Sequence, residues 1–186
     1  MAARTQGHSP PPLIFGVVAL ACLGLVGCEV GALRYSISAG NVAAARELAA
    51  PVNVGTVTAA PGVPGRGVSC GAMSVTPPDD ATFAEYIGGA LRADLGVAGM
   101  AANSGPMLRA QVDQVTLTAS PGNSAGRWHL ALTVSSQAAS VSVEADHDFR
   151  AFAFNKTACE LAALELPAAV QDLVGALLRS PDFRNL

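Results

Sequence analysis

Apolar and polar residues alternate in three consecutive stretches of the second half of the chain, at 108–118, 127–135 and 141–150. Because successive side chains of a strand point to opposite faces, each stretch predicts a β-strand with one buried and one solvated face. The alternation changes phase at Asp113 and Gln114, which indicates a β-bulge in the first strand. Short polar turns separate the three stretches, so together they predict an antiparallel meander with one wet face.

Apolar residues spaced three and four apart predict helices on both sides of this meander. The spacing of Phe83, Ile87 and Leu91 predicts an amphipathic helix over 79–95, capped at Asp79-Asp80 and ending at Gly96. Glu85, Arg92 and Asp94 lie elsewhere on this helical wheel. The pair Gly88-Gly89 in the middle of the helix is unfavourable by about 1 kcal/mol per glycine relative to alanine, and close packing against a sheet explains it.

The segments before helix 79–95 and after the meander have weaker patterns. Asn41 is placed to cap a short helix over 42–50, which Pro51 ends. Residues 52–58 and 68–75 have the pattern of short strands. Near the C-terminus a helical turn runs to Leu166, and Pro167 suits the first position of a new helix that Ser180-Pro181 terminates. These elements predict an α+β fold, with one antiparallel sheet of about four to five strands and helices packed on one face.

The N-terminal segment has a separate pattern. Residues 13–27 form an uncharged apolar run, preceded by a polar start with Arg4. A helix of this length spans about 22 Å, which is short of the roughly 30 Å hydrocarbon core of a membrane. The run has the length of the apolar region of a secretory signal peptide.

The residues at the end of this run, Leu25-Val26-Gly27-Cys28, resemble the lipobox of bacterial lipoproteins. The resemblance implies cleavage after Gly27 and acylation of Cys28, which becomes the first residue of the mature protein. Glu29 follows in place of the Asp that favours inner-membrane retention, so the resemblance implies the periplasmic side of the outer membrane. The alternatives are an ordinary signal peptide and an uncleaved anchor in which Cys28 has no role. Three parts follow: a signal peptide at 1–27, a lipidated tether with a short helix at 28–51, and a periplasmic α+β domain at 52–186.

Two cysteines remain once Cys22 leaves with the signal segment and Cys28 carries lipid. Cys70 and Cys159 are then a pair in an oxidising compartment, which predicts a disulfide bond between them. A bridge that closes a loop of about 90 residues contributes roughly 4 kcal/mol in the chain-entropy model. The alternative is two buried free thiols.

The chain offers little for catalysis or for nucleic-acid binding. With 11 basic and 14 acidic residues it has a net charge of −3, which is opposite in sign to the charge that binds phosphates. No nucleophile elbow, phosphate loop or dinucleotide motif occurs. Acidic residues crowd around His147 at Glu144, Asp146 and Asp148, yet strand geometry places His147 on the opposite face, so a solvated acidic face is favoured over a metal site. The sequence therefore predicts no catalytic residues, no metal and no cofactor.

The order of elements behind the lipidated cysteine is similar to that of two groups of outer-membrane lipoproteins. One group assembles lipopolysaccharide as the plug of a barrel partner, and the other comprises auxiliary lipoproteins of ABC-type lipid transport. The resemblance implies a non-catalytic accessory subunit in envelope assembly or transport, with an envelope protein as its partner. The alternative is a periplasmic binding module for a small or lipidic ligand, which predicts an apolar cavity between helix 79–95 and the sheet.

Overall fold

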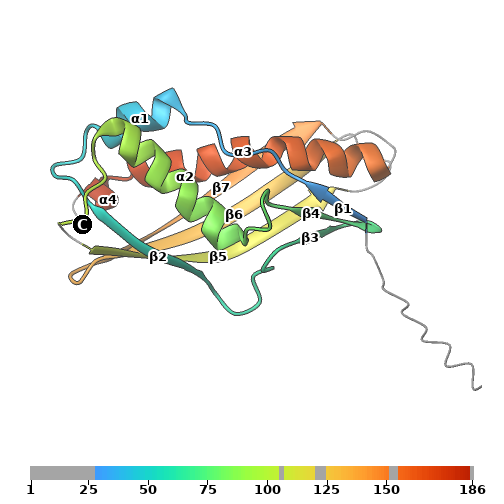
Figure 1. Ribbon diagram of the computed structural model, residues 1–186, viewed down its shortest axis with the longest axis horizontal. Coiled ribbons are helices and arrows are strands. Elements are labelled where there is room, and N and C mark those ends of the chain that lie inside the picture. Colours follow the sequence, from blue (N-terminus) through green and yellow to red (C-terminus); the bar gives the residue numbers. More distant parts are fainter. Residues whose placement is uncertain (1–27, 105–106, 120–124, 151–154, 185–186) are drawn as a thin grey trace, which may run out of the picture.

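The computed structural model describes residues 28–104, 107–119, 125–150 and 155–184, and the signal peptide predicted at 1–27 lies outside them. In chain order, the elements are β1 (Cys28–Gly31), α1 (Ala39–Ala45), β2 (Asn53–Ala59), β3 (Val68–Cys70), β4 (Met73–Thr76), α2 (Phe83–Ala98), β5 (Met107–Ala119), β6 (Ala125–Ser135), β7 (Ser140–Arg150), α3 (Asn155–Arg179) and α4 (Pro181–Arg184). The strands form a four-stranded sheet of order β2-β5-β6-β7 and a three-stranded sheet of order β1-β4-β3 (Figure 1). The predicted α+β class is confirmed.

The meander of β5, β6 and β7 is antiparallel throughout, as its alternation predicts. Its register shifts between Val112 and Gln114, which confirms the predicted bulge. The sequence predicts one antiparallel sheet, whereas the structure has two sheets, in which β2 pairs in parallel with β5, and β1 pairs in parallel with β4. Parallel neighbours need a long crossover, and the connection from β2 to β5, which includes α2, supplies one.

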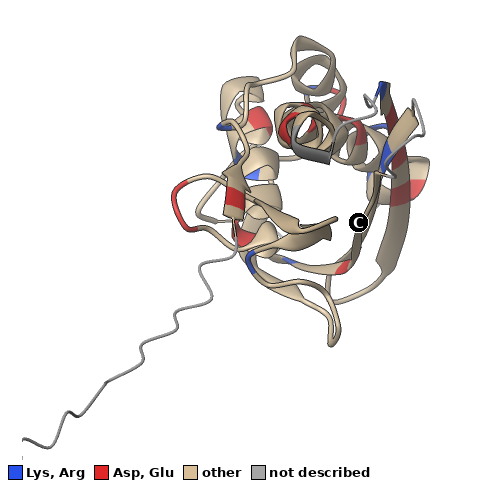
Figure 2. Cartoon of the chain, turned by 90° about the vertical axis from the view of Figure 1, so that its right-hand side faces the viewer, with Lys and Arg blue, Asp and Glu red and all other residues tan. Residues whose placement is uncertain are grey.

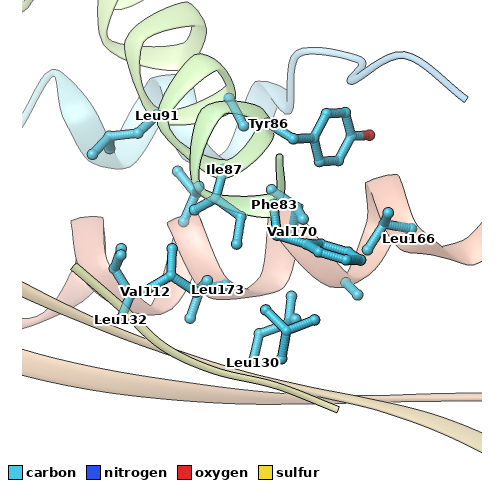
Figure 3. Packing of buried hydrophobic residues seen from close by; sticks show 14 of the residues in the cluster. Phe83, Tyr86, Ile87, Leu91, Val112, Leu130, Leu132, Leu166, Val170 and Leu173 are labelled. Carbon is cyan, nitrogen blue, oxygen red and sulfur yellow. The ribbon is translucent and has the colours of Figure 1, made fainter. Parts of the chain in front are cut away.

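Helices α2 and α3 cover the inner face of the four-stranded sheet, and α1 packs on these two helices (Figures 1 and 2). Figure 3 shows how side chains of α2, α3 and the sheet fill the layer between them. Phe83 of α2 lies with its ring centre 6.2 Å from that of Trp128 of β6. The indole Nε1 of Trp128 donates a hydrogen bond of 2.9 Å to the carbonyl of Ala162 in α3. Trp128 therefore joins all three components of the core.

Helix α2 begins later than its sequence predicts. Thr82 is the N-cap, and Thr82 and Glu85 form a capping box in which each side chain binds the other residue's backbone N–H. Asp79 and Asp80 instead belong to the preceding turn. The helix ends at Gly99, whose positive φ of 75° is typical of a left-handed C-cap. The sequence signal for the true start was Thr-x-x-Glu before an apolar run.

The Gly88-Gly89 pair has a different explanation at each position. A Cβ on Gly88 would lie 2.6 Å from Cγ2 of Val57 in β2, so the absence of a side chain lets α2 approach the sheet. This confirms the packing explanation for Gly88. Nothing lies within 4 Å of the corresponding position on Gly89, which is exposed.

Helix α3 continues through Pro167, so the predicted division into two helices is wrong. Proline in a helix interior is unfavourable by about 3 kcal/mol. The residues on both sides of it, including Leu166, Val170 and Leu173, are fully buried, and their packing outweighs this penalty. Among the described residues, Thr157–Arg179 is also long and apolar enough to cross a membrane, but 61% of its apolar window is buried within the protein, as in a core helix.

The segment predicted as a tether, residues 28–51, is part of the same folded unit. Cys28–Gly31 forms the edge strand β1, and the side chains of Val42, Ala45 and Leu48 are buried. Helix α1 starts at Ser38, whose hydroxyl accepts from the backbone N–H of Asn41, so the predicted cap at Asn41 is wrong. The predicted strand 68–75 is a hairpin of β3 and β4, because Gly71 adopts a positive φ of 63° and reverses the chain.

Candidate anchoring and binding sites

Cys28 is the first residue of β1 and carries an exposed free thiol. Its Cα partner across the sheet is Met73 of β4, and Glu29 is paired with Ser74 in the same register. The chain continues into the core without slack, since the backbone N–H of Ala32 donates a 2.8 Å hydrogen bond to Thr76. The predicted lipidation residue is therefore accessible and at the same time fixed within a sheet.

A disulfide bond joins Cys70 and Cys159, with 5.8 Å between their Cα atoms, as the cysteine count predicts. The alternative of two free thiols is excluded by this bond. Met73 is the Cα partner of Cys70 on one side and of Cys28 on the other. The predicted anchor residue and the disulfide thus lie in one row across the three-stranded sheet, and the row ends on α3.

Polar side chains of α2 and α3 hold the segment that leaves β1. The Tyr86 hydroxyl donates to the carbonyl of Leu33 at 2.9 Å, and the amide of Gln171 donates to that of Ser36 at 2.7 Å. Asp94 is fully buried and accepts hydrogen bonds from the Tyr35 hydroxyl at 2.6 Å and from the backbone N–H of Ser38 at 3.2 Å.

These contacts correct the sequence picture of α2. Asp94 was expected among the residues away from the apolar stripe of α2, but it faces the 35–38 segment and has two donors. Burial raises the pKa of the Tyr35 phenol above its ordinary value, and the hydrogen bond to Asp94 adds to this effect. Burial also raises the pKa of Tyr86. Both phenols are therefore neutral donors at physiological pH.

An apolar groove of about 260 Å³ lies between this segment, the loop before α2, and α2 itself. Its lining residues are Arg34, Tyr35, Pro78, Asp79, Ala81, Glu85, Tyr86, Gly89 and Ala90. The guanidinium of Arg34 bonds the carboxylate of Asp79 at 2.9 Å and so joins two of its walls. Gly89 leaves the α2 wall open, because a Cβ there would meet nothing within 4 Å.

The loop at the groove has an unusual backbone. Asp79 and Asp80 both have positive φ values, 59° and 56°, in the left-handed region that side chains other than glycine rarely occupy. Glu85, on the other wall, accepts from the backbone N–H and hydroxyl of Thr82, and these bonds lower the pKa of Glu85 below its ordinary value. The groove therefore combines apolar walls with a rim in which carboxylates outnumber the single guanidinium.

Residues outside the groove also contribute apolar surface. Leu33 and Ile37, on either side of Tyr35 in the chain, have 55% and 49% of their surface exposed. Sequence patterns gave no sign of the groove, because its walls come from three separate segments. The Thr82–Glu85 capping box was the one readable signal near it.

Two acidic residues of β7 contact basic side chains of the neighbouring strand. Asp148 pairs with Arg127, and Asp146 lies 2.9 Å from Nδ1 of His129, so the outer face of the sheet carries neighbouring opposite charges (Figure 2). The hydrogen bond from Arg127 lowers the pKa of Asp148. His147 points to the other face, as predicted, where its ring nitrogens contact Asp172 at 2.7 Å and Glu165 at 3.2 Å. Among the described residues, no group of three or more His, Cys, Asp or Glu is arranged to hold a metal ion.

The space between α2 and the sheet is filled by side chains rather than by a cavity. Phe83, Ile87 and Leu91 on the inner face of α2 are at most 1% exposed (Figure 3). Leu95 of the same helix is also fully buried. The ligand-binding alternative predicts an apolar cavity at this place, and that prediction is wrong. The groove on the outer side of α2 is where an apolar group could enter.

No family model matches the chain, and no curated protein matches it. A solved structure titled as the crystal structure of an uncharacterized protein is similar at 12% sequence identity, with a TM-score of 0.45. The match covers 78% of this chain and 97% of that chain. A similarity at this level carries no argument about function.

Proposed function

We propose that the protein is a lipid-anchored, non-catalytic accessory subunit of an envelope assembly or transport complex, attached through Cys28 to the periplasmic side of the outer membrane. The observation that carries the proposal is the position of Cys28. It follows a signal-like apolar run and Leu25-Val26-Gly27, and its thiol is exposed at the start of the first strand.

The anchor is tested by replacing Cys28 with Ser in the full-length chain, with Cys22→Ser as the matched control. We expect Cys28→Ser to abolish the acylated N-terminal peptide in mass spectrometry and to leave the protein unprocessed or soluble. Cys22→Ser leaves processing and density-gradient fractionation with the outer membrane unchanged. An unmodified Cys28 in the mature wild-type protein would refute the lipoprotein proposal.

The accessory role is supported by the groove beside Tyr35 and Tyr86. A partner protein would insert an apolar side chain there, and a neighbouring Lys or Arg on the partner would meet the carboxylates of Asp79 and Glu85. Exposed Leu33 and Ile37 would extend the contact. Apolar anchors that fill pockets and are surrounded by polar contacts are the usual source of affinity between proteins.

The partner role is tested by the substitution Gly89→Leu, with Gly96→Leu as its control on the same helix. Both glycines are exposed, and a Cβ meets nothing within 4 Å at either position, so each change also improves helix propensity. We expect Gly89→Leu to lower the yield of envelope proteins that co-purify after mild detergent extraction, and Gly96→Leu to retain it. An isolated monomer from wild-type membranes would contradict the accessory role.

The second candidate is a module that binds a small or lipidic ligand in the same groove. It is favoured by the apolar walls and the volume of about 260 Å³. Native mass spectrometry of the purified protein would then detect a bound small molecule that Gly89→Leu removes. Loss of protein partners with no bound small molecule selects the accessory subunit instead.

A further inference from the structure

We propose that the end of the domain that carries Cys28 rests directly on a layer of zwitterionic phospholipid headgroups, so that the domain stands on the membrane instead of hanging from a flexible tether. This inference rests on the proposed acylation of Cys28. It adds the contact surface and the orientation of the domain, which lipidation alone leaves open.

The first argument is the lack of slack between the anchor and the core. Cys28 is itself paired with Met73, and the next contact inward is the hydrogen bond from Ala32 to Thr76. Neighbouring strands lie about 4.8 Å apart, so Met73 and then Cys70 follow within roughly 10 Å of the acylated residue. The headgroup layer on each side of a bilayer is about 5–8 Å thick. The hairpin of β3 and β4 is therefore close enough to the anchor to contact this layer.

The second argument is the rigidity of this row. Cys70 continues the row from Met73, and its disulfide to Cys159 fastens the row to α3. The segment after β1 is held in turn by the hydrogen bonds of Tyr86 and Gln171. Thermal motion of the anchor strand away from the core would have to break several of these contacts together.

The third argument is the chemistry of the contact surface. Residues 67–76 contain no charged side chain, and Gly71 and Ala72 are exposed at the hairpin turn. Such a surface loses little hydration energy when it meets headgroups, because it has no charge to desolvate. Glu29 is exposed next to the anchor, and the whole chain is acidic, so zwitterionic lipids suit this end better than anionic ones.

The opposite end of the domain then points away from the membrane. β5 runs from Met107 to Ala119 toward the end where β1 and β4 lie (Figure 1). A strand of 13 residues is about 40 Å long. The turn between β6 and β7, which contains Gln137, lies beside the start of β5, because Arg109 is paired with Ser135. Gln137 therefore lies at the end of the domain far from Cys28, whereas Ala72 lies at the Cys28 end, and a label on Gln137 is the reference for a label on Ala72.

The experiment uses the full-length acylated protein with one added cysteine, either Ala72→Cys or Gln137→Cys. Cys28 is then acylated and Cys70 and Cys159 are bridged, so a thiol-reactive fluorophore labels the added site alone. Both sites are exposed turn positions. Each labelled protein is reconstituted into phosphatidylcholine vesicles that contain a lipid with a nitroxide near its headgroup, and the acyl mass on Cys28 is verified.

We expect quenching at Ala72→Cys to exceed that at Gln137→Cys several-fold. A flexible Gly-Ser linker of about 20 residues, inserted between Glu29 and Val30, would let the domain move roughly 25 Å from the surface and should remove the difference. Equal quenching at the two sites of acylated protein overturns this inference and leaves the lipoprotein proposal standing. If Ala72→Cys is still quenched more than Gln137→Cys in the protein with the linker, the inference that the short anchor holds the domain on the membrane is wrong. Absence of the acyl mass overturns both proposals.

Discussion

The β5–β6–β7 meander of the larger sheet and the β1–β4 pair of the smaller sheet differ in how far apart their strands lie in the chain. The strands β5, β6 and β7 of the larger sheet follow one another through short connections. In the smaller sheet, Cys28 is paired with Met73, and the bond between Cys70 and Cys159 links the sheet to α3 across 89 residues. Closing long loops is entropically unfavourable, so short strands from distant segments need further support. The meander is supported by its own pairing, whereas β1, β3 and β4 are short strands that bury Val68 and Val75 in the shared core and are joined to α3 by the disulfide.

The largest expected effect concerns the core of the larger sheet. Trp128 is fully buried and contacts Phe83 of α2 and the Ala162 carbonyl of α3. We expect Trp128→Ala to lower the free energy of unfolding by about 3–5 kcal/mol, because it leaves a cavity and removes the hydrogen bond to the Ala162 carbonyl. Urea unfolding followed by circular dichroism measures this loss, since the substitution removes the chain's one Trp. A smaller loss in Trp128→Phe is the control, and equal losses would contradict a cavity effect.

The disulfide is expected to have a comparable but more local effect. Replacing Cys70 and Cys159 together with Ser should lower the free energy of unfolding by roughly 2–4 kcal/mol. Hydrogen exchange should rise most in β1 and β4, because the row from Cys28 through Met73 loses its link to α3. The amides of β6 serve as the internal reference. A uniform rise over both sheets would show that the smaller sheet has no separate dependence on the bond.

The two central glycines of α2 provide a smaller, matched test at the edge of the larger sheet. We expect Gly88→Ala to be destabilising by about 1–3 kcal/mol, since its Cβ would lie 2.6 Å from Cγ2 of Val57. Gly89→Ala has open space and should be stabilising by up to about 1 kcal/mol through helix propensity. Thermal unfolding of the two variants measures the difference. If both substitutions changed the stability in the same direction, a side chain on Gly88 would not prevent α2 from packing on β2, and the close-packing explanation would be wrong.

The smallest expected effect is at the start of α2, in the chain segment that joins β4 of the smaller sheet to β5 of the larger sheet. Thr82→Ala should lower the free energy of unfolding by about 1 kcal/mol at neutral pH, because it removes the N-cap. The pKa of Glu85 is lower in the folded than in the unfolded protein. The ionised carboxylate therefore stabilises the fold at a pH above the unfolded-state pKa, and this stabilisation is lost as the pH falls through the folded-state pKa. The difference from wild type should therefore narrow in acid. In a Glu85→Gln background, the effect of Thr82→Ala on the free energy of unfolding should not change with pH. If that effect were also constant with pH when Glu85 is present, the capping box would be contradicted.

Features that depend on residues close together in the chain were predicted correctly from the sequence, whereas features that depend on contacts between distant segments were mostly not. The meander, its bulge at Asp113 and the direction of His147 were all predicted, because alternation within each strand decides which face is buried. The disulfide was predicted from compartment and count, without knowledge of the row it completes. The short edge strand β1 was missed, since four residues carry too little pattern to distinguish a strand from a tether.

The sequence by itself determined the local features of this protein: the strands of the meander, an amphipathic helix predicted over 79–95, and an N-terminal segment that resembles a lipoprotein signal ending at Cys28. Periodicity and composition encode such features within a few residues. Tertiary structure alone decided that α3 runs through Pro167, that Asp94 is buried opposite Tyr35, and that Cys28 lies in a sheet braced to α3. In each case a packing or hydrogen-bond energy from a distant segment outweighs a local preference, and Cys28 thereby acquires an orientation that the sequence pattern does not contain.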